Sequence, residues 1–162
     1  MIEIEQVTIA TAEELCRKIT IDLPEYFGLP EINENYALGV CSRRNLGAKI
    51  GDDYVGMISI DFPYPNNSNI YWMAILQKFH GRGIGKKLIE AACVLAQEEG
   101  ASSMTVETLA AECADANYLK TYKFYQANGF DPLFNLKPQG YEWDMVYMVR
   151  VLVKNIQSKS YA

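Results

Sequence analysis

Residues 77–88 read Gln-Lys-Phe-His-Gly-Arg-Gly-Ile-Gly-Lys-Lys-Leu, and this stretch carries more information than any other part of the chain. Its three glycines, at positions 81, 83 and 85, alternate with larger residues, and an amphipathic helix is predicted to begin directly after them. Glycine lets backbone N–H groups approach a ligand closely, and a helix N-terminus presents unpaired N–H donors. No Ser, Thr, Asp or Asn stands there to cap the helix, so the donors are predicted to meet a ligand.

The same stretch is strongly basic, and no acid follows it until Glu90. In a chain of net charge −5, such a patch indicates a bound phosphate or pyrophosphate. A P-loop would need Ser or Thr after Gly-Lys, but Lys87 follows Lys86. A dinucleotide-binding loop would need a third glycine at position 86 or 88, where this chain has Lys86 and Leu88. The sequence therefore matches neither nucleotide-binding motif. The remaining alternative is a glycine-rich turn with a solvated basic face.

Composition limits the class of protein. The 162 residues, 49% of them hydrophobic and 22% charged, suit a single domain, expected at 1–153 with a polar tail at 154–162. The negative net charge argues against nucleic-acid binding. No apolar run is long enough for a membrane span and no signal peptide is visible, so we expect a cytoplasmic protein without membrane contact. One histidine and four cysteines without a Cys-x-x-Cys pair predict reduced thiols and no metal site.

Hydrophobic periodicity predicts alternating strands and helices. One buried helix face is expected from Ile84, Leu88, Ala92 and Leu95. A capping box at Thr11-Ala-Glu-Glu14 predicts the start of the first helix, and Gly129 is a candidate C-cap. The expected strands are 2–7, 46–50, 54–62, 69–76, 104–109 and 144–153, with a turn at 63–68, and the expected helices are 11–21, 32–43, 84–99 and 118–128.

Residues 80–85 resemble motif A of the GNAT superfamily of acetyl-coenzyme A-dependent acyltransferases, Arg/Gln-x-x-Gly-x-Gly/Ala, with His80 where Arg or Gln is usual. A hydrophobic strand at 69–76 precedes the loop, as in the family, and Tyr125-Gln-Ala-Asn-Gly-Phe130 is similar to the family's later Tyr-x-x-x-Gly-Phe element. The order of predicted elements also suits the family. The resemblance therefore implies an α/β fold of the GNAT type, a central mixed sheet flanked by helices.

The resemblance implies acetyl-coenzyme A as cosubstrate, with its pyrophosphate on the loop 80–86. It also implies that the backbone of Ile75 pairs with the pantetheine arm and that its N–H polarises the thioester carbonyl; the alternative is an ordinary interior strand. His80 is at most a phosphate contact, and Asn117 is either a cofactor contact or a helix cap. The candidate cofactor-binding residues are Ile75, Gln77, His80, Gly81, Arg82, Gly83, Ile84, Gly85, Lys86 and Asn117.

Two residues are candidates for acid–base catalysis. Family resemblance implies that Tyr125 is the general acid for the leaving thiolate; otherwise it is a core aromatic next to Tyr122. The strand 69–76 lacks the carboxylate that many members use as base. Glu107 on the following strand is the candidate, with Asp61 as the other choice, and either is alternatively a structural or surface acid.

These features predict an N-acetyltransferase that moves an acetyl group from acetyl-coenzyme A to a primary amine of a small molecule or protein, by direct transfer in a ternary complex. The alternatives are a non-catalytic acyl-coenzyme A sensor and a general phosphate-binding protein. In the family the acceptor pocket is walled by the first two helices, and family habit makes a homodimer a possibility. The first two predicted helices and their connection carry acids and aromatic residues. These side chains either suit a cationic amine or form a solvated loop: Asp22, Glu25, Tyr26, Phe27, Glu31 and Glu34.

Overall fold

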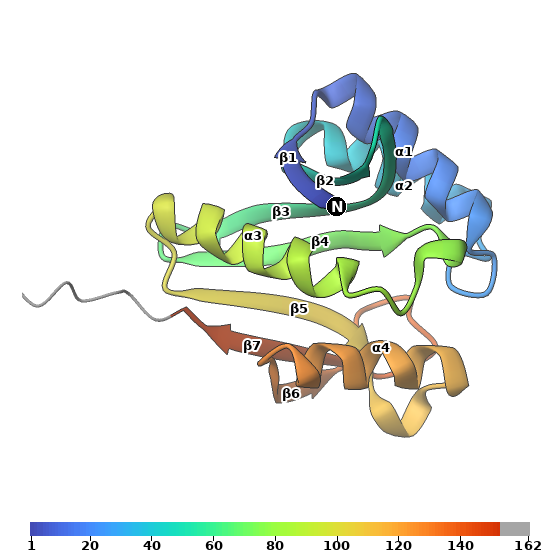
Figure 1. Cartoon of the computed structure of the whole chain (residues 1–162). Coiled ribbons are helices and arrows are strands. Elements are labelled where there is room, and N and C mark those ends of the chain that lie inside the picture. Colours follow the sequence, from blue (N-terminus) through green and yellow to red (C-terminus); the bar gives the residue numbers. More distant parts are fainter. Residues whose placement is uncertain (153–162) are drawn as a thin grey trace, which may run out of the picture.

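One mixed seven-stranded sheet organises residues 1–152, the part of the chain that the computed structural model describes (Figure 1). Neighbouring strands are antiparallel except for β4 and β5, which are parallel. This confirms the expected mixed sheet. In spatial order the strands are β1 (Ile2–Gln6), β2 (Arg44–Ile50), β3 (Asp53–Tyr64), β4 (Asn67–Ile75), β5 (Ser103–Leu109), β7 (Met145–Val151) and β6 (Asp131–Leu136).

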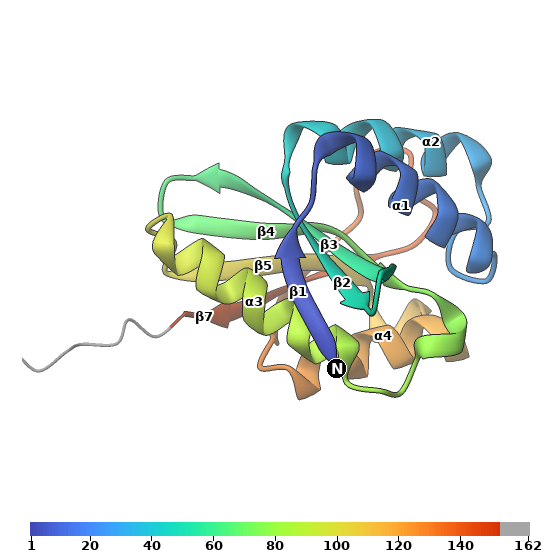
Figure 2. The ribbon, with the colours of Figure 1, turned by 45° about the horizontal axis from the view of Figure 1, so that its top comes forward.

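Helices cover both faces of the sheet (Figure 2). Two apolar clusters, one on each face, hold them there, because each helix buries one stripe of side chains against the strands. On one face lie α1 (Ile9–Asp22) and α2 (Pro30–Gly39), and on the other lie α3 (Ile84–Glu98) and α4 (Ala116–Ala127). Three short 3₁₀ turns complete the elements: η1 (Val40–Ser42), η2 (Gln77–Phe79) and η3 (Ala111–Cys113).

The helix after the glycines forms as expected. Ile84, Leu88, Ala92 and Leu95 are all buried on the face that packs against the sheet. Because these side chains fix how α3 is rotated and where it starts, they also fix the glycine loop at its N-terminal end.

Parallel pairing of β4 and β5 is short. It extends over four residue pairs, from Asn67 with Ser103 to Ile70 with Val106. Beyond these pairs the C-terminal half of β4 continues beside β3 only, while β5 continues beside β7. Figure 1 shows the two strands separating toward their C-terminal ends. The sheet therefore opens between β4 and β5, on the side where α3 begins.

A β-bulge in β4 lies at the point of separation. Ser59 pairs with Trp72 and Ile60 pairs with Ile70, so Tyr71 is an extra residue in β4. The bulge bends the strand and increases its twist, which turns the second half of β4 away from β5.

The Tyr71 side chain is held firmly. The Arg43 guanidinium stacks on its ring, 3.5 Å from the ring centroid. Arg43 also donates to Asp61 Oδ2 over 2.9 Å and to the Gly39 carbonyl over 2.6 Å. These contacts tie the end of α2 to the bulge. They also engage Asp61, the second candidate for the catalytic base, in an ion pair.

The starts of the first two helices differ from the predictions. The capping box at Thr11 was a wrong prediction, because α1 begins at Ile9 and its N-cap Thr8 accepts a hydrogen bond from the Thr11 N–H. The second helix begins earlier than expected, at Pro30, since proline at the first position of a helix needs no backbone partner.

The C-terminal third contains a strand that periodicity missed. All six residues of β6 are exposed, so the alternation of buried and exposed positions that reveals a half-buried strand is absent. The predicted turn 63–68 is shorter, because β3 runs to Tyr64 and β4 begins at Asn67. The expected tail 154–162 lies outside the described residues, and the domain boundary at 153 stays a prediction.

No helix within residues 1–152 is long and apolar enough to cross a membrane. The same residues contain no group of three or more His, Cys, Asp or Glu side chains that could hold a metal ion.

Gly39→Ala tests the tie between α2 and the bulge. A Cβ at position 39 would lie 2.1 Å from the hydroxyl oxygen of Tyr71, whose ring Arg43 prevents from moving freely. We expect the free energy of unfolding to fall by about 1–3 kcal/mol, measured by urea denaturation. Gly28→Ala is the control, because its Cβ would make only an ordinary contact of 3.4 Å. Equal stability of the two variants would contradict the prediction.

Candidate active site

The three loop glycines are needed for different reasons. Gly81 and Gly83 have φ angles of 74° and 76°, a conformation that side chains disfavour, and open space lies where their Cβ atoms would be. Gly85 instead permits close packing, since a Cβ there would lie 2.8 Å from the Phe124 ring. The loop thus exposes its backbone on one side and brings α3 against α4 on the other.

The N-terminus of α3 is available to a ligand. Gly83 is its N-cap, and no side chain caps the first turn. The neighbouring cations Lys78, Arg82 and Lys86 are exposed. Unpaired N–H groups, the helix dipole and these cations together favour an anion at this end of the helix.

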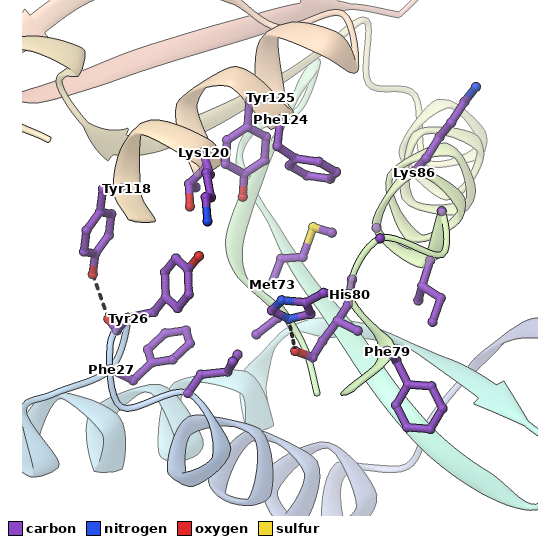
Figure 3. Close-up of a pocket in the computed structure, with 18 residues that line it drawn as sticks. Tyr26, Phe27, Met73, Phe79, His80, Lys86, Tyr118, Lys120, Phe124 and Tyr125 are labelled. Carbon is purple, nitrogen blue, oxygen red and sulfur yellow. Dashed lines mark hydrogen bonds between the residues drawn. The ribbon is translucent and has the colours of Figure 1, made fainter. Parts of the chain in front are cut away.

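A cavity of about 590 Å³ opens beside the loop (Figure 3). Its walls come from the end of β4, the glycine loop, one side of α4 and the connection between α1 and α2. Among the predicted site residues, the cavity brings together Ile75, His80, Gly81, Gly83, Ile84, Gly85, Lys86 and Tyr125.

The backbone of Ile75 faces the cavity. The Leu76 N–H donates to the Val55 carbonyl over 2.9 Å across the β3–β4 ladder. Hydrogen-bonded and non-bonded positions alternate in an antiparallel ladder, so Ile75, opposite Gly56, turns its N–H and C=O away from β3. No β5 residue pairs with β4 at this level, which leaves the Ile75 N–H directed into the opening of the sheet.

The His80 side chain hydrogen-bonds to the end of β4. Its Nε2 lies 2.7 Å from the Ile75 carbonyl oxygen, which can only accept, so Nε2 carries the proton in this arrangement (Figure 3). The ring thereby links the start of the glycine loop to the strand that precedes it. Its expected contact with a phosphate stays a prediction.

The Tyr-x-x-x-Gly-Phe element folds as a helix end. Asn128 is the C-cap, rather than Gly129, which follows it with a φ of 86°. This turn brings the chain back, so that the Phe130 N–H donates to the Tyr125 carbonyl over 3.0 Å and the two rings pack 5.6 Å apart. Phe130 is fully buried and holds the Tyr125 ring in place.

Tyr125 directs its hydroxyl group into the cavity (Figure 3). The residue is only 7% exposed, and burial raises the pKa of its phenol well above the ordinary value. No partner among residues 1–152 hydrogen-bonds to this hydroxyl. It is therefore a protonated donor, held by packing, that remains available to a ligand.

Four predicted site residues do not line this cavity: Gln77, Arg82, Glu107 and Asn117. The Gln77 N–H donates to Asp22 Oδ2 over 2.7 Å. Asn117 is not the helix cap either, because Asp115 caps α4 by accepting from the Tyr118 N–H.

Glu107 lies just beyond the last residue of β5 that pairs with β4. It faces Tyr147 across the β5–β7 ladder, and their hydrogen bond is the main reason that the pKa of Tyr147 is raised to about 12. Glu107 is thus next to the start of the opening, but it does not line the cavity.

Periodicity also missed residues of α4 that line the cavity. Lys120, Thr121 and Phe124 lie on the same helix face as the predicted Tyr125, and their spacing from Tyr125 was the signal that could have found them. Tyr118 lies near the N-terminus of α4 and donates to the Tyr26 carbonyl over 2.7 Å (Figure 3). The expected acids of the α1–α2 segment do not line the cavity, whereas Tyr26 and Phe27 do.

The sequence model of the acetyltransferase (GNAT) family matches residues 11–130, which include the glycine loop and the Tyr-x-x-x-Gly-Phe element. The chain belongs to this family. Its members use acetyl-coenzyme A as cosubstrate, so the chain is a GNAT-type acetyltransferase, as the motifs predicted. No functionally curated protein matches the sequence significantly.

Solved structures share the fold at low identity. A protein of Desulfovibrio desulfuricans assigned to the GNAT family has a TM-score of 0.80 and 17% identity, over 94% of this chain and 100% of that one. The ribosomal-protein-S18-alanine N-acetyltransferase of Escherichia coli has a TM-score of 0.75 and 13% identity, over 98% of each chain. An aminoglycoside 6′-N-acetyltransferase complexed with coenzyme A has a TM-score of 0.73 and 13% identity, over 94% of this chain and 98% of that one.

Gly83→Ala tests the loop. Side-chain strain at this φ should lower stability by about 1–2 kcal/mol and displace the backbone donors, so we expect acetyl-coenzyme A to bind at least about tenfold more weakly by calorimetry. Gly100→Ala is the matched control, because Gly100 has a φ of 94° with open space around it but follows the other end of α3. It should lose stability without losing affinity. The same loss of affinity in both variants would contradict the prediction.

Proposed function

We propose that the protein transfers the acetyl group of acetyl-coenzyme A directly to a primary amine of a small molecule, with both substrates bound together. One observation carries the proposal: a single cavity extends from the glycine loop past Ile75 and Tyr125 to the α1–α2 connection. Both substrates can therefore meet without a covalent intermediate on the protein. The Tyr118–Tyr26 hydrogen bond links the two walls at the far end, which favours a small acceptor over a protein.

The cavity suits acetyl-coenzyme A. The loop offers backbone donors and an uncapped helix end to the pyrophosphate, with Lys86 beside them. No carboxylate belongs to the lining residues, all of which lie within the described part of the chain, so nothing there repels the anion. When bound, the cosubstrate supplies the acetyl group and departs as the free thiol.

Ile75 is proposed to polarise the carbonyl that the amine attacks. Its N–H is directed into the opening of the sheet, where a hydrogen bond would stabilise negative charge developing on a carbonyl oxygen. His80 restrains the same strand end through the Ile75 carbonyl. A donor that is already oriented loses little free energy to reorganisation during the reaction.

Tyr125 is proposed as the general acid. Its phenol keeps the proton because burial raises its pKa, and it can donate a hydrogen bond to a thiolate or transfer the proton to it. Glu107 remains the candidate base. Its position at the start of the opening supports the removal of a proton from the amine through water.

The activity itself is tested by acetyl-coenzyme A binding in a calorimeter, followed by thiol release with a panel of amines. Binding with amine-dependent release supports the proposal. Binding without release for any amine would favour the sensor alternative, and absence of binding would refute the assignment of the glycine loop.

Tyr125→Phe should separate catalysis from binding. We expect kcat to fall about 100-fold while the affinity for acetyl-coenzyme A is unchanged, since only the proton donor is lost. Tyr122→Phe is the control, because Tyr122 lies on the same helix but does not line the cavity. For the wild type, the raised pKa of Tyr125 predicts no loss of kcat through phenol ionisation as the pH rises to about 10. An unchanged kcat in Tyr125→Phe would remove the residue from the mechanism.

Glu107→Gln should lower kcat about 100-fold at neutral pH, and the deficit should shrink as the pH rises and the free amine needs no base. The pH dependence of kcat gives the measurement. Tyr147→Phe is the companion variant, because it removes the partner of the carboxylate but keeps the carboxylate itself, and it should have the smaller effect. A wild-type rate for Glu107→Gln at every pH would eliminate Glu107 as the base.

A further inference from the structure

The charges that line the cavity are unevenly distributed. Its lining residues, all within the described part of the chain, include two lysines, Lys86 and Lys120, and no aspartate or glutamate. Lys86 belongs to the first turn of α3, beside the glycine loop, where the pyrophosphate is proposed to lie. Lys120 belongs to α4 and needs a separate explanation.

The helix α4 shows where Lys120 lies relative to the reaction centre. Phe124 packs against Gly85 of the glycine loop, whereas Tyr118 bonds to Tyr26 of the α1–α2 connection, so α4 spans the cavity from one end to the other. Lys120 precedes Tyr125 by five residues, which places its Cα about 7.5 Å nearer the Tyr118 end along the helix axis. The ammonium group is thus on the acceptor side of Tyr125, away from Lys86.

Lys120 has no counter-ion among the residues that the structure describes. No ion pair or hydrogen bond joins it to another residue in the range 1–152. In Figure 3 its ammonium group is directed into the space between Tyr26, Tyr118 and Tyr125. A cation in this position attracts an anionic group and repels a polycationic ligand.

The surroundings of Lys120 are aromatic. Tyr26 and Tyr118 pack edge to face, 5.9 Å apart, and Phe27 completes this wall of the cavity. The hydrogen bond from the Tyr118 hydroxyl to the Tyr26 carbonyl restrains the α1–α2 connection against α4. This end of the cavity therefore fits a small molecule with an apolar body.

We propose, on the basis of the acetyl transfer proposed above, that the acceptor is a small amine that also carries a carboxylate, an α-amino acid with an apolar side chain. Its carboxylate pairs with Lys120, and its side chain lies against Tyr26 and Phe27. In the reaction the amine nitrogen forms the amide bond, the carbon–sulfur bond of the thioester breaks, the amine loses a proton to the base and the sulfur gains one.

Matched acceptors test this proposal. L-phenylalanine and phenethylamine share the amine and the aromatic body and differ in the carboxylate. We expect the wild type to have a kcat/KM about 10- to 100-fold higher for L-phenylalanine, the range expected for a charge-assisted hydrogen bond. L-leucine against 3-methylbutylamine repeats the comparison with an aliphatic side chain. A preference for the amine lacking the carboxylate in both pairs, or no acetylation of either amino acid, would overturn the proposal.

Variants of Lys120 test whether this residue causes the preference for acceptors with a carboxylate. Lys120→Met should abolish the preference by raising KM for the amino acid, Lys120→Arg should retain it, and KM for acetyl-coenzyme A should be unchanged in both. Lys123→Met is the control, because Lys123 lies on the same helix and is exposed, as Lys120 is, but does not line the cavity. A rise in KM for acetyl-coenzyme A alone would assign Lys120 to the cosubstrate and overturn the proposal.

The two proposals fail in different ways. If simple amines release thiol from acetyl-coenzyme A but amino acids do not, the acetyl transfer stands and the carboxylate-bearing acceptor is refuted. If no amine or amino acid gives thiol release, the proposed function itself fails.

Discussion

The separation of β4 from β5 is the constraint on which the rest of this structure depends. Parallel pairing ends after Ile70 and Val106, and the bulge at Tyr71 turns the remainder of β4 away. The Ile75 N–H then faces an open space instead of a neighbouring strand, while the Ile75 carbonyl accepts from His80. In the interior of a sheet such a donor would need a partner, so the opening is stable only where a ligand or water satisfies it. The contacts of Arg43 with Tyr71, Asp61 and Gly39 hold the bent strand in place.

The glycine loop turns this opening into a binding site. It follows β4 directly, and its left-handed glycines direct the chain into α3, whose buried face fixes the helix against the sheet. Gly85 allows Phe124 to approach, and this contact brings α4 and Tyr125 alongside the same cavity. The anion-binding helix end, the strand end and the tyrosine are therefore positioned by one continuous set of contacts.

The charges of the cavity bear on the choice of acceptor. Several acids lie around the cavity: Asp22 accepts from the Gln77 N–H, Asp115 caps α4 by accepting from the Tyr118 N–H, and Glu25 is close enough to Tyr26 to help raise the pKa of its phenol. None of them lines the cavity, which instead presents aromatic rings and two ammonium groups. Within the cavity itself a zwitterion would find a cation, Lys120, and an apolar wall.

The sequence by itself determined the features that depend on neighbouring residues. Alternating glycines, the helix that follows them, its buried face from Ile84 to Leu95 and the Tyr125–Phe130 helix end could be predicted, because backbone conformation and helix periodicity act over a few residues. Only the tertiary structure decided where β4 and β5 separate, that Glu107 meets Tyr147, and that Lys120 shares a cavity with Ile75. The exposed strand β6 had no periodic pattern to reveal it. These features depend on strand register and on the packing of distant segments, and a local pattern of residues contains neither.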